Sequence, residues 1–272
     1  MQIDNCVALI TGASAGIGRE FARLLAPRVK ALVLIARRQD KLQELSAELK
    51  RINPRLIVHL RGLDLNQRDQ IAALPMWLKE TGVAVDFLIN NAGLGDMGTF
   101  ASSDPERIQQ MLDVNVSALT QLTRLFLPEM LAQKRGGILN VSSSAGFVPI
   151  SGFAVYAATK AYVNSFSEAL RAEVSGSGIS VCSLCPGPVH TEFSEVAQRP
   201  GGPAQPGGPE FVYVSATDVA VAGLAAIEND HPLVIPGGVM KVAMFIVRLT
   251  PLWINRLLAK ATARRRGIEL PD

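Results

Sequence analysis

The chain has 272 residues, of which 48% are hydrophobic and 19% are charged, and this combination suits one large domain with a single core. The net charge is only +3, and the basic residues are scattered except for a cluster at 264–266. The small net charge and this scatter argue against a nucleic-acid partner. The first residues lack the basic and apolar regions of a signal peptide, so we expect a cytoplasmic protein.

Short apolar runs alternate with helical patterns along the chain. We expect strands at 7–11, 31–36, 56–60, 86–90, 137–142, 179–184 and 232–236, and helices at 17–26, 39–52, 67–81, 105–131, 154–175 and 217–229. Near-continuous apolar strands separated by helices predict an α/β, doubly wound Rossmann fold with a mostly seven-stranded parallel sheet, flanked by helices on both faces. Ligands of such sheets bind at the carboxyl ends of the strands.

A glycine-rich turn, TGASAGIG at 11–18, follows the first predicted strand. Its glycines let the backbone turn sharply and approach a pyrophosphate, and the next helix offers unpaired N–H groups at its N-terminus. No Gly-Lys-Ser/Thr follows, which excludes an ATP-binding P-loop. The expected cofactor-binding residues of this turn are Gly12, Ser14, Ala15, Gly16, Ile17 and Gly18.

The second predicted strand ends at Ala36, where a dinucleotide-binding fold often has an acidic residue that holds the adenosine ribose. Arg37 and Arg38 follow instead, and guanidinium groups can bind a phosphate, so the sequence favours NADP(H) over NAD(H). The alternative is that both arginines are solvated surface residues. Asp64, with Leu65 beside it, has two interpretations: a partner of the adenine amino group, or a cap of the 67–81 helix.

The glycine-rich turn and five further motifs resemble the short-chain dehydrogenase/reductase family in its single-domain form. The others are NNAG at 90–93, Asn115 in DVNVSAL, Ser143 in NVSSSAG, YAATK at 156–160 and PGPVHT at 186–191. They occur in the family's order and cover about residues 5–235. The resemblance implies an oxidoreductase that passes a hydride between a nicotinamide cofactor and a carbonyl or alcohol.

Tyr156 and Lys160 are four residues apart and therefore neighbours on one face of the expected helix. A free tyrosine has a pKa of about 10, and we expect two nearby cations, Lys160 and the oxidised nicotinamide, to lower that pKa toward the working range. The resemblance implies that Tyr156 is the general acid and base, and that Lys160 also binds the nicotinamide ribose. It further implies that Ser143 holds the substrate oxygen and that Asn115 supports a water in a proton relay. From the residues alone, Asn115 is a satisfied buried amide.

The resemblance also implies cofactor contacts after the fourth and sixth strands, from Asn91, Ala92 and Gly93 on the adenosine side and from Pro186, Gly187, Val189 and Thr191 on the nicotinamide side. His190 lies in a variable position of its motif, so we expect no chemistry from it. Cys182 and Cys185 form a C-x-x-C within a predicted strand, out of disulfide reach, and we interpret them as packing residues. We expect no metal site.

We divide the chain into a catalytic domain at 1–237 and an apolar, basic, helical extension at 238–272. The domain includes a Pro/Gly-rich region at 194–214, interpreted as a mobile substrate loop or as a surface insertion. In the extension, the amphipathic pattern at 252–266 fits packing over the substrate pocket, packing against a partner subunit, or weak contact with an anionic membrane surface. An apolar pocket is suggested by Leu94, Phe147, Val148, Phe153 and Phe193.

The helices at 105–131 and 154–175 carry apolar residues around much of their circumference, and family members pair through them, which implies a homodimer or homotetramer. We predict an NADP(H)-dependent oxidoreductase of an apolar ketone or aldehyde. Two alternatives stay open: a non-catalytic NADP(H)-sensing binding protein, and a membrane-surface reductase of lipid or acyl carbonyls.

Overall fold

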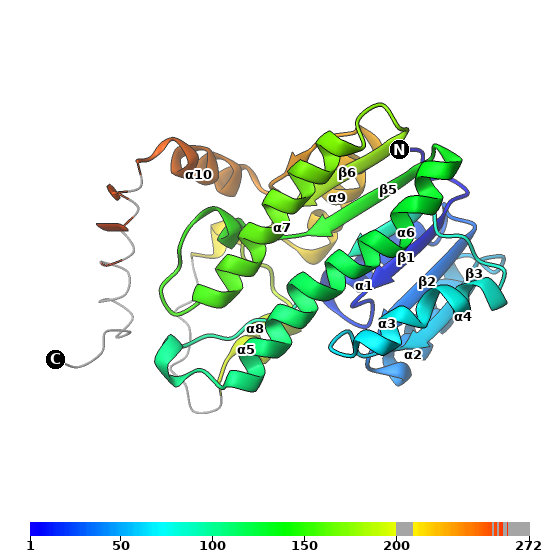
Figure 1. Ribbon diagram of the computed structural model, residues 1–272, viewed down its shortest axis with the longest axis horizontal. Coiled ribbons are helices and arrows are strands. Elements are labelled where there is room, and N and C mark those ends of the chain that lie inside the picture. Colours follow the sequence, from blue (N-terminus) through cyan, green and yellow to red (C-terminus); the bar gives the residue numbers. More distant parts are fainter. Residues whose placement is uncertain (200–208, 252, 255, 258–259, 261–272) are drawn as a thin grey trace.

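The strands form one parallel sheet, as the sequence predicts. A computed structural model describes residues 1–199, 209–251, 253–254, 256–257 and 260. Its strands pair in parallel in the order β3-β2-β1-β4-β5-β6-β7, so the connections change direction between β1 and β4 (Figure 1). Their bounds are β1 Val7–Thr11, β2 Ala31–Ala36, β3 Ile57–Gly62, β4 Phe87–Asn90, β5 Gly136–Val141, β6 Ile179–Leu184 and β7 Leu233–Val234.

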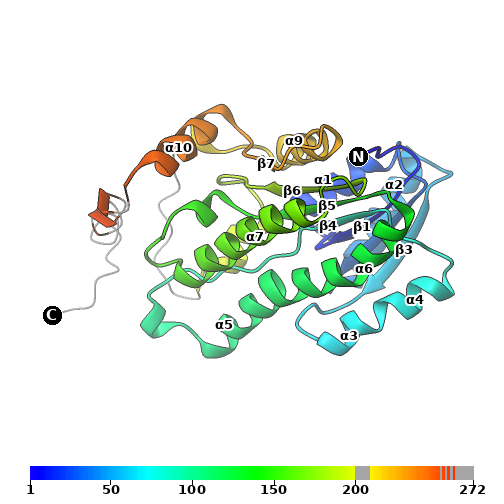
Figure 2. The same cartoon turned by 45° about the horizontal axis from the view of Figure 1, so that its top comes forward.

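Helices cover both faces of the sheet, which confirms the doubly wound architecture (Figure 2). On one face lie α1 (Gly16–Leu25), α2 (Gln39–Ile52) and α9 (Ala216–Glu228). On the other lie α3 (Arg68–Ala72), α4 (Leu74–Glu80), α5 (Pro105–Leu112), α6 (Leu119–Gln133) and α7 (Ala154–Glu173). The remaining elements are α8 (Glu192–Ala197), α10 (Gly238–Leu249), the 3-10 turns η1 (Phe100–Ser102), η3 (Ser144–Phe147) and η4 (Glu210–Val212), and the π-helical turn η2 (Asp113–Ala118).

Two apolar clusters, one on each side of the sheet, form the core. In β1, Ala8 and Ile10 belong to one cluster whereas Val7 and Leu9 belong to the other, because side chains of a strand alternate between faces. Burial on both faces explains why these strands read as continuous apolar runs. Cys6, Cys182 and Cys185 are buried and free, as predicted for packing residues.

Two of the predicted helices are interrupted. The 67–81 prediction was wrong as one helix: α3 and α4 meet at Ala73, with Pro75 near the start of α4. A proline there lacks the N–H that would continue the first helix. The 105–131 prediction contains the π-helical turn η2, which separates α5 from α6. Such turns carry an extra residue and are frequent at functional sites.

Residues 210–228 are long and apolar enough to cross a membrane by length and composition, with a mean hydropathy of 1.5. The α-helix within this stretch, α9, has only 13 residues. It packs against α1 and buries Val219, Ala220 and Leu224 in the core. We therefore interpret the stretch as a core helix.

Candidate active site

Four side chains from three elements meet at the carboxyl edge of the sheet. Ser143 follows β5, Tyr156 and Lys160 lie in the first turns of α7, and Asn115 lies in η2. The sequence folds this way because α7 presents a buried stripe at three- and four-residue spacing, including Tyr156, Lys160 and Val163. Figure 1 shows α7 beginning beyond the arrowhead of β5. The structure therefore brings together the four residues that the resemblance singled out.

Tyr156 is 7% exposed, and its ring lies between two phenylalanines. Its ring centroid is 4.4 Å from that of Phe153 and 5.3 Å from that of Phe193. Burial raises the pKa of Tyr156 to about 12, and a hydrogen bond with Ser143 acts in the opposite direction. The predicted lowering of this pKa is wrong for the chain by itself, because burial penalises the phenolate more than Ser143 stabilises it.

Lys160 is a buried ammonium beside the tyrosine. It is 4% exposed, its Nζ lies 5.6 Å from the Tyr156 ring centroid, and it donates to the carbonyl of Val141 at 2.9 Å. Burial lowers the pKa of Lys160 to about 8. Gly93 leaves space next to it, since a Cβ at Gly93 would lie 3.4 Å from the Lys160 Nζ.

Asn115 is 1% exposed, and its side-chain amide is fully engaged. Its Nδ2 donates to the Leu94 carbonyl (2.9 Å) and to the Thr159 hydroxyl (3.0 Å), while its Oδ1 accepts from the Leu94 N–H (2.8 Å). The side chain thus fastens the loop after β4 to α7. This matches the interpretation of Asn115 as a satisfied buried amide.

Neighbouring serines have different tasks. The Ser143 Oγ accepts from the Ala145 N–H at 3.1 Å and caps η3. Ser142 is buried, and its hydroxyl donates to the main-chain carbonyl of Lys160 at 2.9 Å. Ser142 therefore holds α7 against β5, which leaves Ser143 as the serine that interacts with Tyr156.

The glycine-rich turn has the shape that a dinucleotide pyrophosphate needs. Gly12 and Gly16 adopt left-handed backbone angles, with φ of +66° and +53°, and a Cβ at Gly18 would collide with the carbonyl oxygen of Gly12. The residue before α1, Ala15, offers no side-chain cap, and the first turn of α1 has no acidic residue. The N–H groups of this helix end therefore fit an anionic ligand.

Thr11 joins the ends of β1 and β4. Its hydroxyl accepts from the N–H groups of Asn91 and Ala92, both at 3.0 Å, and Asn91 Nδ2 donates back to the Thr11 carbonyl at 2.9 Å. Sequence reasoning gave Thr11 no role. Its position as the last residue of the first strand, at the start of the glycine-rich motif, was the available signal.

The expected adenosine-side residues lie at the same edge. The Arg38 guanidinium donates to Glu192 of α8 at 2.8 Å and to the Ser14 hydroxyl at 3.3 Å, while Arg37 is exposed. The Asp64 carboxylate accepts from both nitrogens of Asn66, at 3.0 and 2.8 Å. The capping interpretation of Asp64 is wrong, because α3 begins after Gln67 and has no side-chain cap.

The segment after β6 folds back over the glycine-rich turn. A Cβ at Gly16 would lie 3.1 Å from Thr191 Cγ2, so the two segments are in close contact there. Pro186 accepts at its carbonyl from the Ser144 N–H (2.8 Å), and Gly187 lies next to Met240 of α10. Val189 packs against the core.

His190 is exposed and points to surface partners. Its ring stacks on Tyr213 with a centroid separation of 4.1 Å, and its Nε2 lies 3.0 Å from a carboxylate oxygen of Glu210.

An ion pair that the sequence did not reveal anchors the far end of α8. The Arg199 guanidinium binds both carboxylate oxygens of Asp96, at 2.8 and 2.7 Å. This contact lowers the pKa of Asp96 below its ordinary value. Arg107 adds a second anchor by donating to the carbonyls of Gly95 (2.8 Å) and Val196 (3.0 Å). Residues 200–208 of the predicted 194–214 loop lie outside the described residues.

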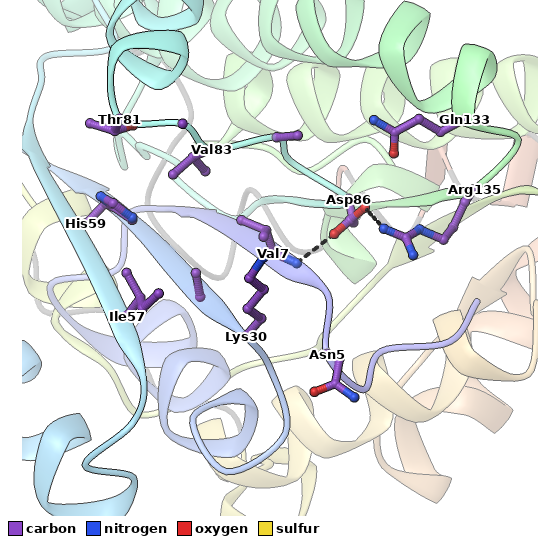
Figure 3. A pocket seen from close by; sticks show the side chains of 13 residues that line it. Asn5, Val7, Lys30, Ile57, His59, Thr81, Val83, Asp86, Gln133 and Arg135 are labelled. Atoms are coloured by element: carbon purple, nitrogen blue, oxygen red, sulfur yellow. Dashed lines mark hydrogen bonds and ion pairs between the residues drawn. The ribbon is translucent and has the colours of Figure 1, made fainter.

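A pocket of about 470 Å³ opens at the opposite edge of the sheet (Figure 3). Its lining includes Lys30, His59, Asp86 and Arg135, and Figure 3 shows the Asp86 carboxylate bound to Arg135 and to the Val7 N–H. It lies at the amino ends of the strands, away from Tyr156. We place the active site at the carboxyl edge instead, because ligands of parallel sheets bind there.

Comparison with known proteins agrees with this geometry. The family model described as short chain dehydrogenase matches residues 6–200, and the chain belongs to that family. It is an oxidoreductase that acts on alcohol and ketone groups. The ketoacyl reductase HetN of Nostoc sp. is 31% identical over 255 residues, which span 92% of this chain and 86% of HetN.

Two solved structures extend the comparison to cofactors. A short-chain dehydrogenase from Sphingobium yanoikuyae in complex with NADPH has a TM-score of 0.75 and 32% identity, with 85% of this chain and 87% of that chain covered. A 3-ketoacyl-(acyl-carrier-protein) reductase from Brucella melitensis complexed with NADH has a TM-score of 0.71 and 25% identity, with 87% and 98% covered. These neighbours support a nicotinamide cofactor for this chain.

Proposed function

We propose that the protein is an NADP(H)-dependent oxidoreductase of apolar ketones or aldehydes, with residues 1–237 as its catalytic domain. The observation that carries the proposal is the buried Tyr156 phenol, in contact with Ser143 and 5.6 Å from the Lys160 ammonium measured to the ring centroid. The bound cofactor supplies or accepts the hydride. The protein itself supplies the groups that bind the substrate oxygen and transfer the proton.

Tyr156 is the proton donor for reduction. A pKa of about 12 keeps its hydroxyl protonated at neutral pH, so that it can donate to a substrate oxygen as negative charge develops there. The Ser143 hydroxyl is the second donor to that oxygen. The Lys160 ammonium stabilises the phenolate that remains, because an opposite charge nearby favours the ionised form.

Asn115 has a positioning role in this proposal. Its side-chain amide is committed to Leu94 and Thr159, so we assign any contact with a relay water to its main-chain carbonyl. The relay would return a proton toward Lys160 after each turnover. Because the amide holds the loop after β4, Asn115 also keeps Gly93 beside the Lys160 ammonium.

The cofactor preference rests on the arginines after β2. We propose that Arg37 and Arg38 bind the 2′-phosphate of NADP(H), that the glycine-rich turn binds the pyrophosphate, and that Asp64 and Leu65 lie near the adenine. The NADPH complex of the Sphingobium neighbour supports this preference, whereas the NADH complex of the Brucella neighbour leaves it to be tested. Glu192 of α8 competes with the phosphate for Arg38, since it already accepts a hydrogen bond from that guanidinium.

An apolar substrate fits the lining near Tyr156, where Leu94 is buried and Phe153 and Phe193 contact the tyrosine ring. We further propose a homodimer or homotetramer, in which the outward Leu112 of α5 and Tyr162 of α7, each 39% exposed, contact a second copy. Free buried cysteines suit a reducing compartment, and we place the protein in the cytoplasm.

The test is NADPH oxidation with a panel of small ketones, steroids and long-chain carbonyl compounds. We expect turnover of an apolar carbonyl, and Tyr156→Phe should lower kcat by roughly a hundredfold or more while NADPH affinity changes little. A Tyr213→Phe variant is the matched control, since that ring stacks on the exposed His190 and lies outside the group formed by Tyr156, Lys160, Ser143 and Asn115. Tight NADPH binding without oxidation on any carbonyl would favour the cofactor-sensing alternative, and undiminished turnover by Tyr156→Phe would refute the assigned chemistry.

A further inference from the structure

Helix α10 has two apolar faces, and among the residues that the structure describes only one of these faces meets the rest of the protein. Met244 is 9% exposed, and Met240 lies against Gly187. The opposite face is open to solvent, with exposed fractions between 49% and 69% for five apolar residues. We call this face the α10 stripe: Val239, Val242, Phe245, Ile246 and Leu249.

Two more exposed apolar residues follow the end of α10. Trp253 is 61% exposed and Leu257 is 58% exposed, beyond the extended residue Thr250 at which the helix stops. An exposed apolar surface of this extent marks a site that contacts another surface. At 12 residues, α10 is too short to cross a membrane, which takes about 20 apolar residues.

The segment that carries the stripe has charge of one sign. Between positions 231 and 268 the sequence has no aspartate or glutamate, and its basic residues are Lys241, Arg248, Arg256, Lys260 and the arginines at 264–266. Lys241 and Arg248 are seven residues apart, two helical turns, so they lie along the same border of the stripe. Arg248 is held there, with its guanidinium 5.8 Å from the Phe147 ring centroid.

The stripe lies at the end of the molecule that holds the candidate site. Helix α10 contacts η3, which directly follows Ser143, and also η4. Figures 1 and 2 both place α10 beyond the carboxyl edge of the sheet, at the end opposite α4. A surface that bound the stripe would therefore lie beside the carboxyl edge of the sheet, where the candidate site is.

We propose that the α10 stripe docks the protein onto an anionic membrane surface, with α10 lying in the headgroup region. An apolar helix face bordered by lysine and arginine is the pattern that binds such surfaces. A second copy of the chain fits less well, because a two-fold contact would bring Lys241 and Arg248 toward their own copies, with no acidic residue in the segment to pair with them. Docking requires no catalysis, so it stands apart from the proposed reaction.

The experiment measures binding of the full-length protein to sedimented vesicles, made of phosphatidylcholine alone or with about one third phosphatidylglycerol, an anionic lipid. The test variant is Phe245→Asn with Ile246→Asn. Met76→Asn is the matched control, since Met76 is 70% exposed on α4, away from the stripe. We expect the wild type and the control to bind anionic vesicles. Their affinity should fall severalfold when the salt concentration rises from about 0.05 M to about 0.5 M, because salt screens the attraction between the basic residues and the anionic lipids.

The stripe variant should bind these vesicles at least roughly tenfold more weakly than the control, because two apolar side chains that enter the membrane surface have been replaced by polar ones. Its thermal midpoint and NADPH affinity should equal those of the control, which shows that the fold is intact. Equal vesicle binding by the two variants, or no wild-type binding, overturns the proposal. Loss of a dimer in the stripe variant, seen by size-exclusion chromatography, with no vesicle binding by the wild type, would assign the stripe to a second copy. Absence of reductase activity would affect only the proposed function.

Discussion

Replacing Asn115 with alanine should destabilise the fold as well as reduce activity. The substitution removes three hydrogen bonds and leaves the buried N–H and carbonyl of Leu94 without their side-chain partner. An unsatisfied buried polar group costs about 1–3 kcal/mol, so the two groups together give an expected loss of about 2–6 kcal/mol. The Thr159 hydroxyl adds little, because it keeps its bond to the Tyr156 carbonyl at 2.7 Å.

The assay is urea-induced unfolding followed by tryptophan fluorescence, with the m-value checked for constancy. Asn229→Ala is the matched control, since this exposed asparagine makes a single side-chain bond, to the Ala225 carbonyl at 2.7 Å, and its loss should cost about 1 kcal/mol or less. A cost for Asn115→Ala no larger than that of the control would refute the assignment of Asn115 as the anchor of the loop after β4.

The remaining predictions concern charge. Lys160→Met should be more stable than the wild type below pH 8, by about 3 kcal/mol at most. This difference in unfolding free energy should shrink as the pH rises from about 8 to 10.5, because the folded state binds the lysine proton more weakly than the unfolded state does. A pH-independent difference in urea unfolding would contradict this prediction. Arg38→Gln should weaken NADPH binding roughly tenfold without affecting NADH binding. Glu192→Gln should tighten NADPH binding, because it frees Arg38 from Glu192. If calorimetric titration shows weaker NADPH binding for both variants, Glu192 does not compete with the cofactor for Arg38. Asp96→Asn should raise KM roughly tenfold with NADPH affinity unchanged, because α8 loses its anchor to Arg199; steady-state kinetics with an unchanged KM would exclude that role.

Local chemistry explains why the architecture was predictable. Strands buried on both faces must be apolar throughout, so β1 and β2 stand out from the amphipathic helices between them. The site residues were predicted from the resemblance to a known family, which was visible because each of them lies within a short motif at a strand end or on one helical turn. The interruption at Pro75 could also have been predicted, because a proline cannot continue the hydrogen bonding of the preceding helix. We predicted one helix because the apolar periodicity of 67–81 continues past this proline.

Features that depend on distant parts of the chain were not predictable. Asp96 and Arg199 are 103 positions apart, and neither lies in a motif, so only the fold brings them together. The pKa of Tyr156 depends on how closely Phe153 and Phe193 enclose the phenol, which no spacing in the sequence specifies. Likewise, the apolar pattern of α10 does not say which face packs inward; its contact with Gly187 does.

The π-helical turn η2 accommodates one extra residue between α5 and α6. Deleting one residue within 113–118 would restore ordinary helical winding and leave the rotation of α5 about the shared axis nearly unchanged. Deleting one residue within 108–112, in the α-helix itself, would instead turn the start of α5 by about 100°. Arg107 would then swing away from the carbonyls of Gly95 and Val196, which it now bridges. A one-residue deletion in α5 would therefore remove one of the two anchors of α8, whereas the same deletion in the π-helical turn would leave both in place.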